Sequence, residues 1–564
     1  MPSLRLGRQA WLLLAILCVA LYLRLATIAF GLPAMNDPDE LMFELGALRM
    51  LRTHSLDPGW FGHPATTTMY VLAVIDAAVF GFATLTGRAA SARQFGSMVY
   101  ADPSWIVLPG RIAMVLFALG TIWLTWSLAR RFFGPRAGLV AALLLALNPV
   151  HITWSQIIRS DMMACLFMLL CLRSCAAIAD SGKRRDYAWS ALWLGLAIAT
   201  KWPFALSGLA IAAASIAAAQ NGVLSRRTAM ARAVGAGIAG LVILLLVSPY
   251  LLLDYPTVLK NVQGEGQARH LGATGGSPWY NLSWYLGGPL LTGFGVLGLA
   301  LVAFGALHLG HRRRAIVVLV PVAGAFLVLF CLQHLVWERW ALPLMPLAAM
   351  VAAWGYVEFS ERLQRSFVAG WVRYVPAALL LATVLPLSAR AAADGRARMN
   401  DTRQQASAWA RGHIPRGSRV LIEHNAFDML DRPWSFLFPM GNAGCVDVVA
   451  LIEGRASYAT IDLARDGRSN VDYGTMAPQR RAECRADFAI LTNYGRYRQE
   501  RALFPREYAA YRALIATGSV VATFAPAPGT NAGPLVVIVD LRPAGVRTQN
   551  ERFGVPPRMR SHLR

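Results

Sequence analysis

Apolar runs close to the length of a membrane crossing recur through the first 390 residues of this 564-residue chain. An α-helix needs about 20 predominantly apolar residues to cross the hydrocarbon core of a bilayer. The chain is 56% hydrophobic and only 15% charged, and its mean hydropathy is +0.44. This balance excludes a disordered chain and fits a soluble enzyme poorly. The sequence therefore predicts a polytopic α-helical membrane protein.

The basic residues of the chain form short clusters between the apolar runs. A formal net charge of +23 on a soluble protein would suggest a nucleic-acid partner. Here the clusters at 183–185, 226–232 and 312–314 separate apolar runs, a pattern typical of cytoplasmic loops. We therefore expect membrane lipids with anionic headgroups and a phosphorylated substrate as partners, and no nucleic acid.

The same clusters predict which side of the membrane each loop faces. The apolar run over 9–31 follows basic residues and is followed by no small-residue cleavage site, so we interpret it as a first span rather than a signal peptide. This places the N-terminus in the cytoplasm and predicts about eleven spans with the C-terminal part outside the cytoplasm. The run 67–84 must then be re-entrant or surface-lying, since Asp39 and Asp161 are expected on the same side.

The composition changes after about residue 391. Between 401 and 540, short apolar stretches alternate with polar, helix-like segments, which predicts a small α/β domain. We therefore divide the chain into a membrane domain (1–390), an extracytoplasmic α/β domain (391–542) and a disordered basic tail (543–564). Seven cysteines are too few and too scattered for a disulfide framework or a zinc site. A disulfide between Cys445 and Cys484, which lie in the polar part, is left open.

Predicted outside loops hold nearly all the unusual polar residues of the membrane part. The first contains Asp37, Asp39 and Glu40, directly after the first span. Three carboxylates within four residues, beside a low-dielectric surface, suit a general base or a cation site. The alternative is a solvated loop in which Asp39 caps the helix that begins near Leu41.

Two further loops carry charges at the ends of apolar runs. Arg159 and Asp161 close the loop 151–161, where a helix cap and a surface anchor are the alternatives to a functional role. Lys201 interrupts what would otherwise be one long apolar stretch. A charge inside a membrane segment is costly and by default indicates function, with snorkelling to the surface as the alternative.

The remaining candidates are His270, in the loop 254–284, and Arg339, in a short outer turn beside Glu338. The nearby aromatic residues are expected to form an interfacial belt. The sequence has no Walker motif, no dinucleotide fingerprint and no metal-ligand spacing of His and Cys.

Acidic and cationic groups are thus predicted to gather outside the cytoplasm, where nucleotide substrates are scarce. A phosphate-linked lipid substrate would explain this arrangement. Arg159, Lys201 and Arg339 would stabilise a phosphate that develops charge as it leaves. One carboxylate base would suffice to activate the hydroxyl or amine of an acceptor.

Several short motifs follow one another in order. They are Pro38-Asp39-Glu40 with Phe43, His63-Pro64-Ala65, Arg159-Ser160-Asp161, the stretch from Gly195 to Lys201, and Glu338-Arg339-Trp340 with Pro343 and Pro346. Trp409, residues 414–418, Ala486-Asp487-Phe488 and Tyr497-Arg498 follow in the C-terminal part. Together they resemble the GT-C membrane glycosyltransferases of the protein-mannosyltransferase and aminoarabinose-transferase type (glycosyltransferase family 39 or 83). Ala65 replaces a second proline that is frequent there, which indicates a divergent subfamily.

The resemblance implies a GT-C fold in the bacterial cytoplasmic (inner) membrane. It implies transfer of a sugar, with inversion, from a polyprenyl-phosphate donor to a protein, lipid or glycan acceptor on the extracytoplasmic face. By position, Asp39 would be the base or the acceptor-orienting carboxylate, Glu40 would support it, and Asp161 would be a second active-site carboxylate. Substrate-binding roles would fall to Asp37, His63, Arg159, Lys201, His270 and Arg339. No cofactor is required, and a divalent metal at Asp39 and Glu40 is left open.

Two other functions fit a polytopic membrane protein. A transporter or flippase would place ionisable residues near the bilayer midplane and would show repeated halves, and we find no such repeat. A non-catalytic assembly protein would use the C-terminal domain as its docking module.

Overall fold

The structure, a computed structural model, describes residues 7–366, 370–424, 426–447, 450, 460–461, 464 and 471–543. The tail predicted over 543–564 lies outside these residues, apart from its first position. The chain divides into two compact units. The first contains residues 1–30 and 37–396, and the second contains residues 31–36 and 397–564.

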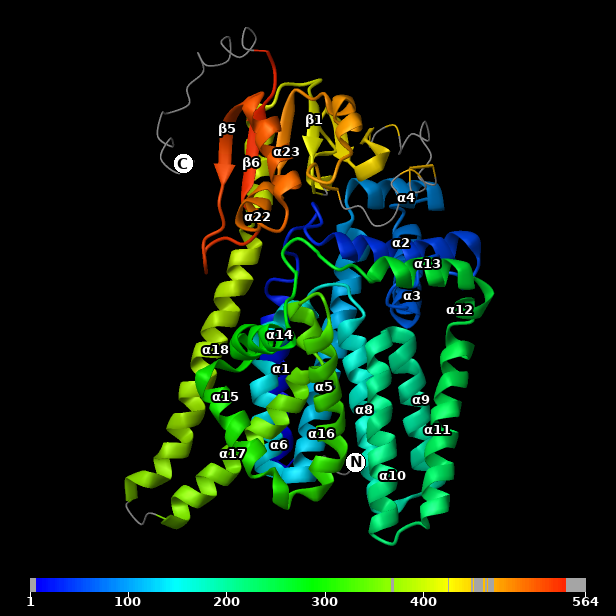
Figure 1. Cartoon of the computed structure of the whole chain (residues 1–564), viewed down its shortest axis with the longest axis vertical. Helices are drawn as coiled ribbons and strands as arrows, with labels where there is room; N and C mark the ends of the chain where they lie inside the picture. The colour runs from blue at the N-terminus through cyan, green and yellow to red at the C-terminus, as the bar shows by residue number, and fades with distance from the viewer. Residues whose placement is uncertain are drawn as a thin grey trace. The chain divides into compact units, whose positions relative to one another are not determined.

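The first unit is helical (Figure 1). Its helices are α1 (Arg8–Leu25), α2 (Pro38–Thr53), α3 (Thr66–Leu85), α4 (Ala92–Ala101), α5 (Ser104–Phe133), α6 (Pro135–Ala146), α7 (Pro149–Ser155), α8 (Asp161–Ser181), α9 (Arg184–Thr200), α10 (Gly208–Gln220), α11 (Arg226–Val247), α12 (Tyr250–Leu253), α13 (Tyr255–Glu265), α14 (Pro278–Tyr285), α15 (Leu291–Leu307), α16 (Arg313–Leu332), α17 (Leu344–Ser366) and α18 (Val375–Met399). The long helices form a bundle, and α2, α4 and α13 lie across one end of it (Figure 1).

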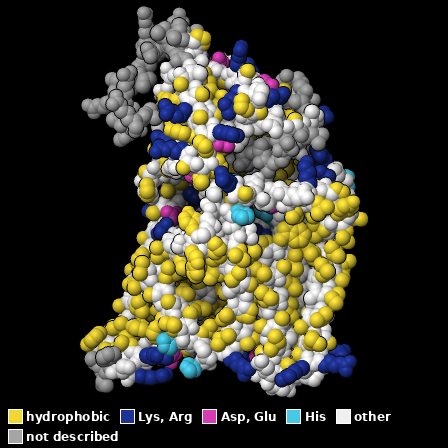
Figure 2. Space-filling view, in the orientation of Figure 1, with side chains coloured by type: hydrophobic (Ala, Val, Ile, Leu, Met, Phe, Trp, Pro, Cys, Tyr) yellow, Lys and Arg dark blue, Asp and Glu magenta, His cyan; other side chains and the backbone are white. Residues whose placement is uncertain are grey.

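The polytopic membrane architecture predicted from the sequence is confirmed. Within the described residues, nine helices are long and apolar enough to cross a membrane, or ten if the bent pair α6–α7 is one span. This is fewer than the eleven or so predicted. The 17-residue helix α9 is shorter than these nine, whereas α3, predicted to be re-entrant, is among them. Hydrophobic side chains cover the bundle broadly, as a lipid-facing surface requires (Figure 2).

Small residues let helices of the bundle approach closely. Gly305 on α15 faces Val351 of α17, and Gly355 on α17 faces Leu301 of α15. A Cβ atom at either glycine would collide with the carbonyl oxygen of the opposite helix. Such pairs of small residues are typical of packed membrane helices. The helices around them form one continuous apolar core.

The second unit is the predicted α/β domain. Its elements are α19 (Thr402–His413), β1 (Arg419–Ile422), β2 (Ser435–Pro439), β3 (Cys445–Asp447), β4 (Phe488–Leu491), α22 (Tyr494–Gln499), α23 (Pro505–Ala516), β5 (Ser519–Phe524) and β6 (Val536–Asp540). The sheet order is β3-β2-β1-β4-β6-β5. Strand β1 pairs in parallel with β2 and β4, and the other pairs are antiparallel.

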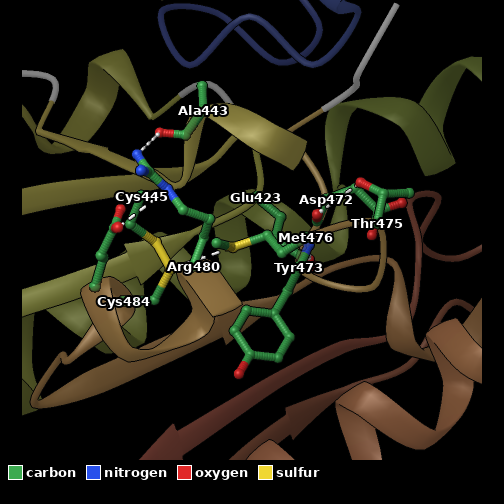
Figure 3. Close-up of a disulfide and its surroundings, with 10 residues drawn as sticks. Glu423, Ala443, Cys445, Asp472, Tyr473, Thr475, Met476, Arg480 and Cys484 are labelled. Carbon is green, nitrogen blue, oxygen red and sulfur yellow. Dashed lines mark hydrogen bonds and ion pairs between the residues drawn. A yellow bond between two sulfur atoms is a disulfide. The ribbon is translucent and has the colours of Figure 1, made fainter. Parts of the chain in front are cut away.

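A disulfide joins Cys445 to Cys484 (Figure 3). It links β3 to the short 3-10 helix Pro478–Cys484, where Arg480 pairs with Glu483 at 3.0 Å and donates to the carbonyl oxygen of Ala443 at 3.1 Å. The sequence left this pairing open, and the structure resolves it.

Candidate active site

The basic clusters that separate the apolar runs gather at one end of the bundle. Asp180, near the end of α8, pairs with Arg131 and Arg314, both at 2.9 Å. Arg313 donates to Gln220 at 2.8 Å, so the start of α16 lies against the end of α10 at the same place. This end is the one predicted to face the cytoplasm.

The candidate site lies at the opposite end. Asp161 begins α8, and the 21 residues of that helix separate it from the basic end by roughly 30 Å. Lys201 follows the end of α9, which begins in the basic cluster at Arg184. The sequence correctly separated the two sets of charges.

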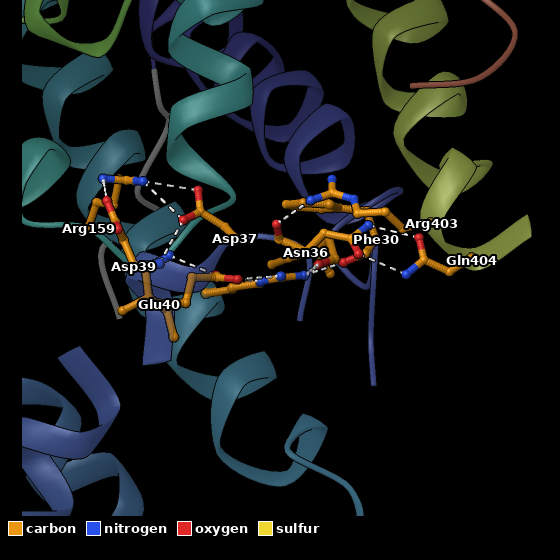
Figure 4. A network of polar contacts seen from close by, with 11 residues as sticks. Phe30, Asn36, Asp37, Asp39, Glu40, Arg159, Arg403 and Gln404 are labelled. Carbon is orange, nitrogen blue, oxygen red and sulfur yellow. Dashed lines mark hydrogen bonds and ion pairs between the residues drawn. The ribbon is translucent and has the colours of Figure 1, made fainter. Parts of the chain in front are cut away.

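Arg159 joins the carboxylates of the first loop (Figure 4). Its Nη2 donates to both carboxylate oxygens of Asp37, at 3.0 and 3.1 Å, and its Nη1 lies 2.5 Å from Oδ2 of Asp39. Asp37, and not Asp39, is the N-cap of α2, because its side chain accepts from the backbone N–H of Asp39 at 3.0 Å. Asp39 is therefore free of the capping role that was its alternative reading.

Asp39 is the most accessible of these groups, with 40% of its side chain exposed, against 6% for Arg159. Burial raises the pKa of Asp39, but the guanidinium groups of Arg159 and Arg339 together lower it by more. The pKa therefore lies well below its ordinary value. Arg339 Nη1 stands 3.9 Å from the same carboxylate oxygen. Asp39 thus presents an ionised carboxylate to an accessible surface.

Asp161 and Lys201 form a buried ion pair, with Nζ 2.5 Å from Oδ1 and side-chain exposures of 3% and 7%. Burial lowers the pKa of Lys201, and Asp161 opposes that shift. The second oxygen of Asp161 has no hydrogen-bond partner within the described part of the chain. This oxygen is the acceptor atom that the buried pair leaves open among the described residues.

His63 lies beside this pair because the chain at 63–64 runs antiparallel to Lys201. Pro64 and Lys201 form a β-bridge, and Trp202 donates its N–H to the carbonyl oxygen of His63 at 2.8 Å. Burial lowers the pKa of His63 strongly, and the positive charges of Lys201 and Arg339 lower it further. Its imidazole is thus neutral at physiological pH.

Arg339 and His270 share an aromatic neighbour. The guanidinium of Arg339 lies 4.6 Å from the ring centre of Trp337, and the His270 ring meets the same indole edge-on at 4.8 Å. Burial, followed by the charge of Arg159, lowers the pKa of Arg339 to about 10. His270 therefore contacts Trp337, the aromatic side chain that also lies against Arg339.

Glu40 is held by an arginine that the sequence analysis did not single out. Arg111 donates to both oxygens of Glu40, at 2.8 and 2.6 Å, and neither side chain is exposed. Glu40 also accepts from the N–H of Ile158 at 3.0 Å. The signal for Arg111 was available, since a charge within a long apolar run indicates a functional or structural partner.

The donor set at Asp39 and Glu40 does not fit a divalent metal. Both Glu40 oxygens are bonded to Arg111, and Asp39 faces two guanidinium groups. Among the described residues, no group of three or more His, Cys, Asp or Glu side chains is placed to hold a metal ion.

The comparisons with known proteins agree on the fold. Residues 97–252 match the family model described as dolichyl-phosphate-mannose-protein mannosyltransferase, a stretch that contains Arg111, Arg159, Asp161 and Lys201. No curated protein sequence matches the chain.

Among solved structures, the chain is similar to ArnT from Cupriavidus metallidurans in the apo state, with 16% identity and a TM-score of 0.51, over 95% of this chain and 99% of that one. It is also similar to the oligosaccharyltransferase AglB from Archaeoglobus fulgidus, with 12% identity and a TM-score of 0.50, over 90% of this chain and 72% of that one. The expected resemblance is confirmed: the chain has the fold of the GT-C membrane glycosyltransferases.

Proposed function

We propose that this chain is an integral-membrane glycosyltransferase that transfers a sugar from a polyprenyl-phosphate donor to an acceptor outside the cytoplasm. The observation that carries the proposal is the accessible, ionised Asp39 beside the cations Arg159 and Arg339. A base and a phosphate-binding charge are the two groups that such a transfer needs. The fold supports it, since the AglB structure contains dolichol-phosphate and an inhibitory peptide.

In this mechanism Asp39 accepts a proton from the hydroxyl or amine of the acceptor. The acceptor atom forms a bond to the anomeric carbon of the sugar from the face opposite the phosphate, and the configuration inverts. The bond between that carbon and the phosphate oxygen breaks, and its electron pair stays on the phosphate. Arg339 and Lys201 stabilise the charge that develops on the leaving polyprenyl phosphate.

The other residues of the site have supporting roles in this proposal. Asp161 holds Lys201 and uses its free oxygen to bind the substrate. Asp37 and Glu40 position Asp39, the first through Arg159 and the second by tying the start of α2 to α5. Arg159 also lies 5.4 Å from the ring centre of Trp154. His63 and His270 contribute neutral or aromatic contacts to the donor or acceptor.

We place this site on the outer face of the bacterial cytoplasmic membrane, with the N-terminus in the cytoplasm. The gathering of basic clusters at the opposite end of the bundle supports this orientation. The disulfide Cys445–Cys484 supports an extracytoplasmic C-terminal domain, since structural disulfides persist in oxidising compartments. A protein, a lipid and a glycan all remain candidate acceptors.

Donor consumption tests the proposal. Membranes with the wild type or Asp39→Asn are incubated with a panel of polyprenyl-phosphate sugars and an extract of native membranes, and the lipids are analysed by mass spectrometry. We expect one donor to be lost with release of polyprenyl phosphate in the wild type alone. Equal loss in both would overturn the role of Asp39. Movement of the donor across proteoliposome membranes without covalent change would instead support a transporter.

A further inference from the structure

The six residues that precede the candidate base belong to the C-terminal unit. Residues 31–36 group with 397–564, although the chain before and after them belongs to the helical bundle. Asn36 is 7% exposed and forms two reciprocal amide hydrogen bonds with Gln404, each 2.8 Å long (Figure 4). Arg403 donates to the backbone carbonyl oxygen of Asn36 at 2.6 Å. We call these three residues the Asn36 clamp.

The clamp is fixed within the C-terminal unit. Asp401, 3% exposed, caps α19 and binds Arg403 through its N–H at 2.9 Å, its Nε at 2.9 Å and its Nη2 at 2.8 Å. Thr402 donates its N–H to Ala532 at 2.9 Å and its hydroxyl to Pro534 at 2.7 Å. The guanidinium of Arg403 donates two hydrogen bonds to Asp401 at the start of α19, so it has little freedom to move.

The chain on both sides of the segment is fixed to the bundle by one residue. Arg111 donates to the carbonyl oxygen of Phe30 at 2.8 Å and binds both oxygens of Glu40. Between Phe30 and Glu40, the clamp fixes one more atom of the chain. It is the carbonyl oxygen of the peptide bond that joins Asn36 to Asp37. Asp37 in turn caps α2 through the N–H of Asp39 and binds Arg159.

We infer that the Asn36 clamp fixes the backbone directly before Asp37 and thereby positions the Asp37–Asp39 turn that carries the catalytic carboxylate. The inference rests on the proposed function for the role of Asp39. Asn36, Arg403 and Gln404 are positioning residues and do not touch the substrate. A reciprocal Asn–Gln pair is directional, and truncation of Gln404 leaves the buried amide of Asn36 unpaired.

The clamp is tested in the full-length, detergent-solubilised protein with Gln404→Ala. The matched control is Gln405→Ala on the same helix, since the Gln405 side chain donates to Asn400 in an exposed hydrogen bond of 3.0 Å. The first readout is hydrogen–deuterium exchange of the peptide that covers residues 36–43. We expect exchange there to become about tenfold faster in Gln404→Ala, as the loss of one or two hydrogen bonds predicts, and to stay unchanged in the control.

The second readout is the rate of sugar transfer. We expect Gln404→Ala to lower kcat by about tenfold, because a displaced base slows the chemical step, with little change in the KM for the donor. The exchanged pair Asn36→Gln/Gln404→Asn keeps both hydrogen bonds and is expected to recover part of the rate. Unchanged exchange in Gln404→Ala would overturn the clamp, and faster exchange with an unchanged kcat would overturn its role in catalysis. If the wild type transfers no sugar, the proposed function fails, whereas the exchange result still decides whether the clamp orders the turn.

Discussion

The carboxylate of Asp39 and the guanidinium of Arg159 lie 2.5 Å apart, yet Asp39 keeps 40% of its side chain exposed while Arg159 is almost fully buried. A buried cation behind an accessible carboxylate keeps that carboxylate ionised without covering it. This arrangement favours a base that stays ionised over a wide pH range, and Arg159 is the charge that lowers the pKa of Asp39 most, ahead of Arg339.

Replacement of Arg159 by glutamine is therefore expected to change the pH dependence of transfer. In the wild type the pKa of Asp39 lies below its ordinary value, so kcat/KM falls only at strongly acidic pH. Without the guanidinium, burial dominates and the pKa rises, so the acidic limb of kcat/KM should move up by about one pH unit or more. Arg269→Gln, at an exposed position in another outer loop, should leave the limb in place. If the acidic limb of kcat/KM stays at the same pH in Arg159→Gln, the protonation of Asp39 is not what produces that limb.

Arg339 is expected to act on the donor rather than on the base alone. Its only ion pair with a carboxylate among the described residues is the long one of 3.9 Å with Asp39. Arg339→Met should weaken competitive inhibition by free polyprenyl phosphate by about tenfold or more, the value of a charge-assisted hydrogen bond. The measurement is the inhibition constant, with Arg269→Met as the control. Equal inhibition in wild type and Arg339→Met would remove Arg339 from the phosphate site.

Glu40 should matter for folding as much as for catalysis. Glu40→Gln leaves the guanidinium of Arg111 buried without a matching charge, which costs about 3–5 kcal/mol when a buried pair is broken. The midpoint of thermal unfolding of Glu40→Gln, measured in detergent, should lie clearly below that of the wild type. Glu361→Gln is the matched control, because Glu361 and Arg365, its partner, are 42% and 73% exposed and such exposed pairs contribute about 1 kcal/mol or less. Equal midpoints for the two variants would contradict a structural role for the buried pair.

Local pattern was enough to single out the charges of the candidate site. Arg159, Asp161 and Lys201 stand out because each interrupts or closes an apolar run, and charges at such positions are costly. The basic clusters predicted which end of the bundle each loop lies at, because they also stand between apolar runs. The alternating short apolar stretches predicted the α/β domain. These signals depend only on neighbours in the sequence.

Partners far apart in the chain were beyond this reasoning. The pairing of Glu40 with Arg111 joins α2 to α5, and that of Asn36 with Gln404 spans 368 positions. No local periodicity encodes either one. The set of candidate spans also differs from the predicted one, because α9, at 17 residues, is shorter than the helices that qualify, α17 is not among them, and α3 is.

The state of the C-terminal disulfide in cells tests the orientation of the whole chain. If the α/β domain lies outside the cytoplasm, Cys445 and Cys484 should be joined in cells quenched with acid and alkylated before lysis. A parallel sample that is reduced before alkylation should carry the label on both cysteines and serves as the control. Reduced, alkylated Cys445 and Cys484 in the cell would contradict an extracytoplasmic domain.

The variant with both cysteines replaced by serine should lose about 2–5 kcal/mol of domain stability, because the bond closes a loop with a sequence separation of 39 residues.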